Sequence, residues 1–225
     1  MTHTITRRFG GVAAAVTLAA AALASPANAG PREIDYVNLG DSFSAAFGTG
    51  GVHDLGGSCY QASGPDHVSM LDSKMGVDLD LNMACAGAGA AQIAGIAATV
   101  AAPYLADAEL VTLTLGGNDI SWTTFLEACI GGTDAQCAGA TALVGGEIST
   151  VSAKVAYALN VIREKAPGAK IVVLGYPYFF DGTSPNPLLT PAEVATSREL
   201  TAGLNSAIKA GTATVDNAVY VDVTK

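Results

Sequence analysis

Residues 34–42 read Ile-Asp-Tyr-Val-Asn-Leu-Gly-Asp-Ser, a run of β-forming residues that ends in a glycine and two polar side chains. Such a run, short and bounded by a turn signal, predicts a strand over 34–39. Further runs of the same kind predict strands over 78–83, 110–115, 170–174 and 219–223. We therefore expect a five-stranded sheet whose first strand leads directly into Ser42.

Longer stretches with helical patterns lie between these strands, at 66–75, 120–129, 145–166 and 191–213. The last of them has a clear start, because Thr190 is a good cap, Pro191 suits the first helical position and Glu193 the third. Strands that alternate with helices favour a parallel sheet covered on both faces, an α/β fold. No internal repeat or linker divides the chain, so one domain is expected.

The first 29 residues have the pattern of a secretory signal peptide. Arg7 and Arg8 precede an apolar run over 12–24, and Ala27-Asn28-Ala29 forms a small-x-small cleavage site. The apolar run is shorter than the ~20 residues that span a bilayer. We expect residues 30–225 to form a secreted, extracellular domain with no stable membrane anchor, and both the Sec and the Tat export routes stay open.

The composition is that of a globular domain rather than a disordered or nucleic-acid-binding chain. Of the 225 residues, 50% are hydrophobic and 14% charged, and the formal net charge is −9. A chain of this size hides roughly 70% of its unfolded surface in a core. Lys and Arg do not cluster beyond the first few residues, which argues against nucleic acid or an anionic membrane surface as a partner.

The chain has four cysteines, Cys59, Cys85, Cys129 and Cys137. An even number in a secreted protein indicates disulfides, and four cysteines allow three pairings. We expect the pairing of neighbours in sequence, Cys59–Cys85 and Cys129–Cys137. A zinc site is not expected, because the sequence has no C-x-x-C spacing and no nearby pair of histidines.

Polar or glycine-rich loops follow the first three predicted strands, and each carries one residue of chemical interest. Ser42 should open a helix, where unpaired N–H groups can stabilise an oxyanion beside its hydroxyl. Gly87 offers a backbone amide to a closely approaching ligand, and Asn118 offers a neutral side-chain donor. Each also has an ordinary interpretation, as a helix cap, a small-residue loop and an Asx turn. Together they predict one hydroxyl and two oxyanion donors on one rim of the sheet.

Two other sites built on α/β folds are disfavoured by the sequence. No G-x-G-x-x-G follows the first strand, which argues against a dinucleotide-binding domain. No G-x-S-x-G surrounds Ser42, which argues against the α/β-hydrolase fold.

Three blocks of sequence carry a resemblance to a known family: G-D-S-F-S at 40–44, A-C-A-G-A at 84–88 and G-G-N-D at 116–119. In this order and at these strand ends they resemble the SGNH (GDSL) hydrolases, most closely the secreted esterases and lipases of actinobacteria. The G-Y-P at 175–177 fits the same group, and the resemblance covers 34–223. The cysteine positions also resemble that group's disulfides, although its members usually carry a third pair.

The resemblance implies a three-layer α/β/α sandwich of the flavodoxin-like type with a mostly parallel five-stranded sheet. It implies that Ser42 is the nucleophile of a carboxylic ester hydrolase that works through an acyl-enzyme. The oxyanion hole would consist of the Ser42 and Gly87 amides and the Asn118 side chain. No cofactor is implied, the substrate would be a small-molecule or lipid ester, and a monomer is the default state.

The family's histidine near the C-terminus is missing: a D-x-x-H pattern from Asp222 would put it at position 225, where the chain has Lys225. A serine without an adjacent base is a weak nucleophile. Three explanations stay open. We expect that the chain is an incomplete copy, cut before the loop that carries the histidine. The alternatives are that His53 or His67 acts as the base, or that the protein is an inactive relative that binds acyl or glycan ligands.

Several other residues have two interpretations each. Trp122 suits either an acyl pocket or the core. The aromatic residues after the fourth strand suit either the wall of the substrate cleft or the core: Tyr176, Tyr178, Phe179 and Phe180. Asp119 is expected to cap the helix that follows it, Asp222 to end the last strand near the site, and the loop 181–187 to help form the rim.

Overall fold

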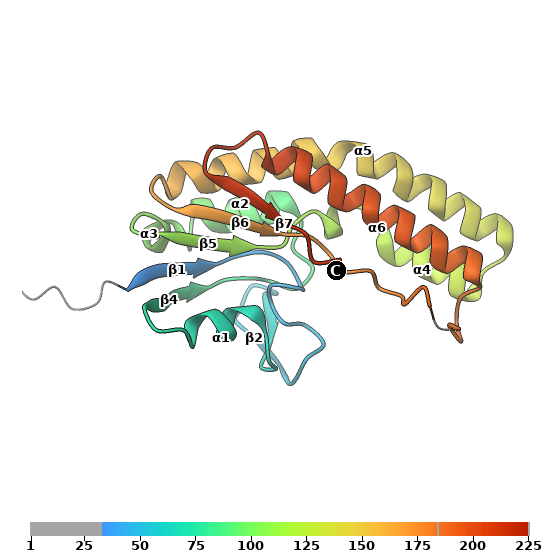
Figure 1. Ribbon diagram of the computed structural model, residues 1–225, viewed down its shortest axis with the longest axis horizontal. Coiled ribbons are helices and arrows are strands. Elements are labelled where there is room, and N and C mark those ends of the chain that lie inside the picture. The colour runs from blue at the N-terminus through green and yellow to red at the C-terminus, as the bar shows by residue number, and fades with distance from the viewer. Residues whose placement is uncertain (1–32, 184, 225) are drawn as a thin grey trace, which may run out of the picture. The chain divides into compact units, whose positions relative to one another are not determined.

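The computed structural model describes residues 33–183 and 185–224, so the predicted signal peptide lies outside the described residues. Its main feature is a five-stranded sheet in the order β4-β1-β5-β6-β7, in which every pairing is parallel (Figure 1). The strands are β1 (Ile34–Asn38), β4 (Val77–Asn82), β5 (Leu110–Leu113), β6 (Lys170–Leu174) and β7 (Ala218–Val221). The five predicted strands are therefore confirmed to within about two residues at each end.

The strand order creates a switch point beside β1. After β1 the chain first forms β4 on one side and then returns to form β5 on the other side. In open α/β sheets the loops that leave the strands on the two sides of such a point enclose a crevice, which is where ligands bind. The loops after β1, β4 and β5 are the ones that carry Ser42, Gly87 and Asn118.

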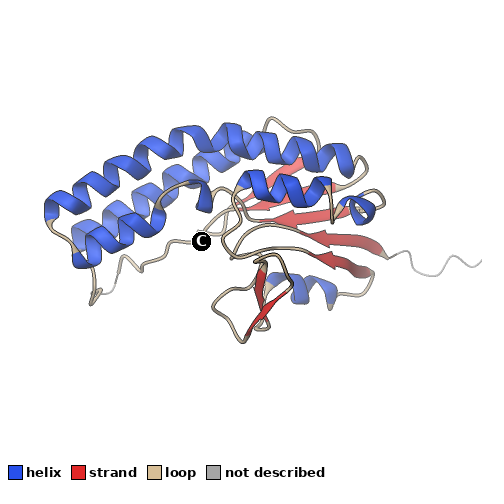
Figure 2. Cartoon of the chain, turned by 180° about the vertical axis from the view of Figure 1, so that it is seen from behind, coloured by secondary structure: helices blue, strands red, loops and turns tan. Residues whose placement is uncertain are grey.

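Helices form the two outer layers of an α/β/α arrangement (Figures 1 and 2). One face of the sheet carries α2 (Ala90–Ala98), α3 (Ala102–Leu105), α5 (Asp134–Lys165) and α6 (Pro191–Thr212). The long helices α5 and α6 lie side by side, and α4 (Trp122–Gly131) packs against α5. The short α1 (His67–Asp72) lies on the other face, beside β4. The three-layer α/β fold predicted from the sequence is confirmed.

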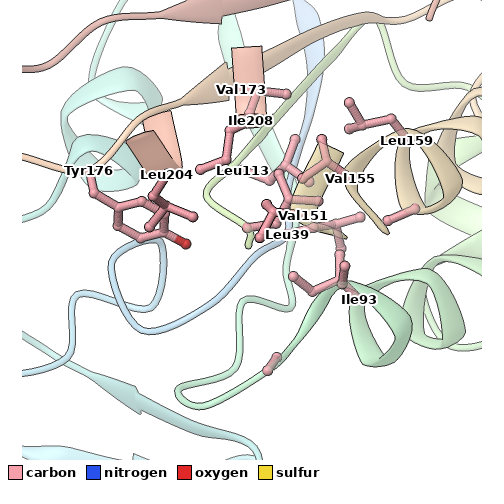
Figure 3. Close-up of a cluster of buried hydrophobic side chains, with 14 of the residues drawn as sticks. Leu39, Ile93, Leu113, Val151, Val155, Leu159, Val173, Tyr176, Leu204 and Ile208 are labelled. Atoms are coloured by element: carbon pink, nitrogen blue, oxygen red, sulfur yellow. The ribbon is translucent and has the colours of Figure 1, made fainter. Parts of the chain in front are cut away.

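The main core lies between the sheet and the long helices. Alternate residues of the central strands face α5 and α6 and are fully buried: Val37, Val111, Leu113, Ile171 and Val173. From the helices, Val151, Val155, Leu159 and Ile208 fill the same space (Figure 3). Buried branched side chains of this kind stabilise by about 1.5–3 kcal/mol each, which fixes the strands that hold the loops at their ends.

Helix α6 starts where its sequence predicts, and helix α5 does not. The side chain of Thr190 accepts from the Glu193 amide at 3.3 Å while Glu193 accepts from the Thr190 amide at 2.7 Å, so α6 begins with a capping box as expected. The helix predicted over 145–166 begins eleven residues earlier, at Asp134. A second capping box, with Thr133 and Gln136, starts it there, and three glycines inside the helix had weakened the pattern.

Two helices and a hairpin had no counterpart in the sequence prediction. Helices α2 and α3 follow Gly89. Helix α2 consists largely of alanine, whose helical pattern is weak because alanine does not separate a polar from an apolar face, and α3 has only four residues. An antiparallel hairpin is formed by β2 (Val52–Asp54) and β3 (Tyr60–Ala62), strands of three residues each. Elements this short fall below the length at which alternation can be recognised.

The disulfides of the structure join Cys59 to Cys85 and Cys129 to Cys137, the neighbours in sequence. The first ties the hairpin to the loop after β4, and the second ties α4 to α5. None of the helices within the described residues is long and apolar enough to cross a bilayer.

Removing the Cys59–Cys85 disulfide by a double change to alanine is expected to lower the free energy of unfolding by about 3.5 kcal/mol. The matching change at Cys129–Cys137 should lower it by only about 2.5 kcal/mol. The difference arises because the first bridge closes a 26-residue separation and the second an 8-residue separation. Urea unfolding of both double variants measures the two values, and a larger loss for the shorter loop would contradict the expectation.

Candidate active site

Ser42 lies in a single tight turn at the carboxyl end of β1. The Asp41 amide still donates to the Thr114 carbonyl at 3.1 Å, so the chain stays paired with the β5 side until the residue before Ser42. The Ala45 amide then donates to the Asp41 carbonyl at 2.8 Å, and the Phe47 amide donates to the Ser42 carbonyl at 2.9 Å.

The expectation that Ser42 opens a helix is wrong, because the segment after it makes only turns. Ala46 and Gly48 have positive φ values of 55° and 95°, which no continuing helix accommodates. No helix dipole therefore acts at Ser42 from the segment that follows it. An oxyanion beside its hydroxyl must be stabilised by individual N–H groups.

Gly40 is what permits the tight turn into Ser42. Its φ is +120°, and a Cβ there would lie 2.6 Å from the Thr114 carbonyl oxygen and 2.8 Å from Ser44 Oγ. Only glycine fits both the conformation and the space.

Gly87 lies in a loop that is hydrogen-bonded to two other segments of the chain. The Cys85 amide donates to the Gly40 carbonyl at 2.9 Å, and the Ala86 amide donates to the Tyr60 carbonyl at 3.0 Å. Gly87 itself has φ +87° and open space around it, so its amide is presented without a side chain in the way. The hairpin that the sequence did not predict thus helps to position this amide.

Asn118 lies in the 3₁₀ turn η1 (Gly117–Asp119), directly after β5. Its Nδ2 donates to the Ala88 carbonyl at 3.1 Å, which orients the carboxamide and leaves its second N–H for another acceptor. The bond also joins the loop after β5 to the loop after β4.

Ser42, Gly87 and Asn118 line one cavity of about 380 Å³, so the structure brings the three sequence-predicted residues together. Within the described residues, the amides of Ser42 and Gly87 have no hydrogen-bond acceptor, and neither does the second N–H of Asn118. Unpaired donors that face one cavity form a place for a developing negative charge.

The other wall of this cavity is aromatic. Phe179 stacks on Trp122 with ring centroids 4.9 Å apart and meets Phe43 edge to face at 5.8 Å. All three side chains line the cavity, together with Ile120 and Leu204. An apolar wall opposite a few convergent donors is typical of a site for a small organic ligand.

Comparison with known proteins identifies the family. The sequence model of the GDSL-like Lipase/Acylhydrolase family matches residues 39–225. The chain belongs to this family. The match begins just before the G-D-S block and includes the loops of all three cavity residues.

Relatives of this GDSL-family chain include Streptomyces lipases. A lipase of Streptomyces rimosus is 31% identical over 70% of this chain and 58% of the relative, and Lipase 2 of Streptomyces coelicolor is 32% identical over 94% of this chain and 78% of the relative. The chain spans about three fifths of the length of the S. rimosus lipase and of Lipase 1 of S. coelicolor.

Solved structures of two Streptomyces enzymes have a similar fold. The extracellular lipase of S. rimosus superposes with a TM-score of 0.75 and 26% identity, covering 85% of this chain and 80% of that one. Phospholipase A1 from Streptomyces albidoflavus gives a TM-score of 0.69 and 28% identity, covering 82% of this chain and 77% of that one.

Neither described histidine of this GDSL-family chain lines the cavity. His53 lies in the exposed strand β2, opposite Gln61. His67 is the first residue of α1, and its Nε2 is buried without a partner among the described residues. Burial lowers the pKa of His67, and the nearby Asp66 opposes that shift. Nothing in this geometry favours either residue as the base for Ser42.

The stability of the protein is expected to decrease as the pH falls through about 6.5, the ordinary histidine pKa. Because burial lowers the pKa of His67 in the folded state, the unfolded chain takes up the proton first. His67→Gln should make the unfolding midpoint less dependent on pH between 7 and 5 than it is in the wild type. An unchanged slope in the His67 variant would contradict this.

The remaining candidate residues have definite places. Trp122 and Phe179 line the cavity, Tyr176 lines it while being buried, and Phe180 packs on the core. Tyr178 lies under the Arg198 guanidinium, 3.9 Å from the ring centroid. Asp222 follows β7 and accepts from the Thr224 amide at 2.9 Å.

The expectation that Asp119 caps the helix after it is wrong. Its Oδ2 accepts from the Ala90 amide at 2.8 Å, so it satisfies the first turn of α2 instead. At the start of α4, the acceptor is Glu147 of α5 instead. Its carboxylate accepts from the amide of Ser121, the residue before α4, at 2.6 Å. Both contacts are long-range in sequence, which is why spacing alone could not reveal them.

Proposed function

We propose that the protein is a serine ester hydrolase in which Ser42 attacks a carboxylic ester carbonyl. One observation carries the proposal: a serine hydroxyl shares a cavity with three N–H donors, those of Ser42, Gly87 and Asn118, that have no acceptor in the described part of the chain. The lipase names of its relatives support the same chemistry.

In the proposed reaction, Ser42 Oγ bonds to the carbonyl carbon and its proton passes to a general base. The carbonyl oxygen becomes an oxyanion, which the three N–H groups stabilise. Collapse of the tetrahedral intermediate breaks the bond to the alcohol oxygen, which takes up the proton and leaves an acyl-enzyme on Ser42. Water then adds to the acyl carbon in the same way, and the carboxylic acid is released as the Ser42 hydroxyl is restored.

The shape of the site favours esters with an apolar part on each side of the carbonyl. Beyond the aromatic cavity, a second hollow of about 530 Å³ also reaches Ser42 and Gly87. Phe47, Val52 and Tyr60 line it, and each of these side chains is at least 40% exposed. The formal net charge of −9 disfavours polyanionic substrates. Small-molecule and lipid esters therefore fit best.

Hydrolysis of a series of p-nitrophenyl esters by the full-length protein tests this function. We expect saturable turnover, with KM falling as the acyl chain lengthens from two to about eight carbons because each buried methylene contributes about 0.8 kcal/mol. Binding of the esters, seen by calorimetry, without any release of acid would overturn the proposal in favour of a ligand-binding protein.

We propose in addition that the protein is extracellular and monomeric. The signal pattern over 1–29 and the extracellular lipase among its relatives support secretion. The intact mass of the protein from culture medium is expected to correspond to a chain that begins at Gly30, and a mass that includes Met1 would contradict cleavage there.

A further inference from the structure

Tyr176 connects the loops that carry Ser42 and Asn118. Its side chain is only 2% exposed, yet its hydroxyl makes two hydrogen bonds. It donates to Asp41 Oδ2 and accepts from the Gly117 amide at 2.9 Å. Asp41 directly precedes Ser42, and Gly117 directly precedes Asn118. One phenol oxygen thus joins the residue before the nucleophile to the residue before the oxyanion donor.

The Asp41 partner of the phenol is itself held in place. Asp41 Oδ1 accepts from the Thr114 hydroxyl at 2.6 Å and from the Phe43 amide at 3.1 Å. The Asp41 side chain is therefore fixed to Thr114, the residue after β5, and to the turn after Ser42, in addition to its bond with Tyr176. A buried network in which each polar atom has a partner is rigid.

Tyr176 is also clamped through its own backbone. Its amide donates to Asn205 Oδ1 at 2.8 Å, and its carbonyl accepts from Asn205 Nδ2 at 2.8 Å. Asn205 lies in α6, so the ring is anchored to a long helix of the core. Figure 3 shows Tyr176 next to Leu204 at the edge of the buried cluster.

The phenol of Tyr176 also packs tightly against the loop after β5, at Gly117. A Cβ added at Gly117 would lie 2.9 Å from both Cζ and the hydroxyl of Tyr176. Gly117 therefore has no room for a side chain while the tyrosine is present. The close approach fixes the distance between β6 and the loop after β5 sterically as well as by the hydrogen bond.

The direction of the two hydrogen bonds follows from the Gly117 amide, which can only donate, so the phenol oxygen accepts from it and the hydroxyl proton goes to Asp41. Burial raises the pKa of Tyr176 well above its usual value, and the neighbouring Asp41 carboxylate adds to the shift. The phenol therefore keeps its proton at any pH at which the protein functions. Burial also raises the pKa of Asp41, whose hydrogen bonds to Thr114 and Tyr176 oppose that shift. The neutral phenol donates to the carboxylate and uses its lone pair to accept from Gly117.

From this bridge we infer that Tyr176 is a positioning residue, which holds the Asn118 amide at a fixed distance from the Ser42 hydroxyl through Gly117 and Asp41. The inference rests on the proposed function of Ser42 and Asn118. An interaction of this kind contributes to the rate only if the oxyanion forms where the donors already point. The residue touches no reacting atom in this role and acts through its two neighbours.

Tyr176→Phe keeps the ring and removes only the oxygen. We expect kcat for a p-nitrophenyl ester, counted per serine titrated by an alkyl fluorophosphonate, to fall about tenfold, while KM stays within twofold. Tyr178→Phe is the matched control, because its ring lies on Arg198 outside the cavity, and it should keep the wild-type kcat. A loss that only reflects fewer folded molecules would vanish on counting per titrated serine.

Amide hydrogen exchange gives a readout that does not depend on turnover. The Gly117 amide is expected to exchange at least tenfold faster in Tyr176→Phe and at the wild-type rate in Tyr178→Phe. If the wild-type protein shows neither turnover nor labelling, the proposed function is refuted but the role of Tyr176 is not. The exchange rate at Gly117 then still tests whether Tyr176 holds the loop in place. Unchanged exchange at Gly117, or an unchanged kcat in an active protein, would overturn the inference.

Discussion

Ser42→Ala is expected to lower kcat/KM for any ester substrate by about 10⁴-fold or more. The remaining activity is the residual catalysis that the oxyanion donors provide without the nucleophile. The reason is that the variant loses the only atom proposed to form the acyl-enzyme. The loss should be confined to chemistry, because within the described residues the Ser42 hydroxyl makes no hydrogen bond that supports the fold.

Two measurements separate that outcome from simple misfolding. Initial rates with a p-nitrophenyl ester give the activity, and thermal unfolding gives the stability, which should stay within about 0.5 kcal/mol of the wild type. Ser63→Ala is the control, a change at an exposed serine whose hydroxyl donates to the Gly51 carbonyl. Activity above about one hundredth of the wild type in Ser42→Ala would mean that another group is the nucleophile.

Asn118→Ala is expected to lower kcat by about 100- to 1,000-fold with little change in KM, the effect of losing one oxyanion donor. Its carboxamide is already oriented by the bond from Nδ2 to the Ala88 carbonyl, so the second N–H requires no rearrangement when the oxyanion forms. A donor that acts only on the oxyanion changes kcat and kcat/KM equally.

Asn160→Ala is the matched control for that change. Asn160 is exposed on α5, and its Nδ2 donates to the Ala156 carbonyl of its own helix at 2.8 Å, so its loss should leave kcat unchanged. Asn118→Asp tests the sign of the charge, because a carboxylate cannot donate and repels the oxyanion, and it should be at least as slow as Asn118→Ala. An effect of Asn118→Ala on KM alone would indicate that the residue binds substrate rather than the transition state.

The sheet could be predicted from the sequence because its strands are short and its three central strands, β1, β5 and β6, are largely buried and followed closely by glycines. A run such as that at 110–115 has few structural interpretations other than a buried strand. In a parallel sheet, the residues that follow the strands then lie at one edge. That is why Ser42, Gly87 and Asn118 could be expected on one rim, and the structure places them in one cavity. The start of α6 was equally predictable, because a capping box is a local signal.

The features that the sequence did not reveal depend on contacts between distant residues. Asp119 caps a helix that begins 29 residues before it in the chain, and Tyr176 bonds to Asp41 across 135 positions. No spacing rule contains such pairs. The turn at Ser42 was misjudged for a related reason: Gly40 and the packing against Thr114 fix its geometry, whereas a serine after a strand more often caps a helix.

The central claim is that Ser42 is the nucleophile, and mapping a covalent adduct tests it most directly. The full-length protein is incubated with an alkyl fluorophosphonate, digested, and its peptides are analysed by tandem mass spectrometry. The account predicts one phosphonyl group per chain, located on Ser42, at a rate that Asn118→Ala lowers. Adduct on a different serine, or no adduct at a probe concentration that labels a known serine esterase completely, would contradict it.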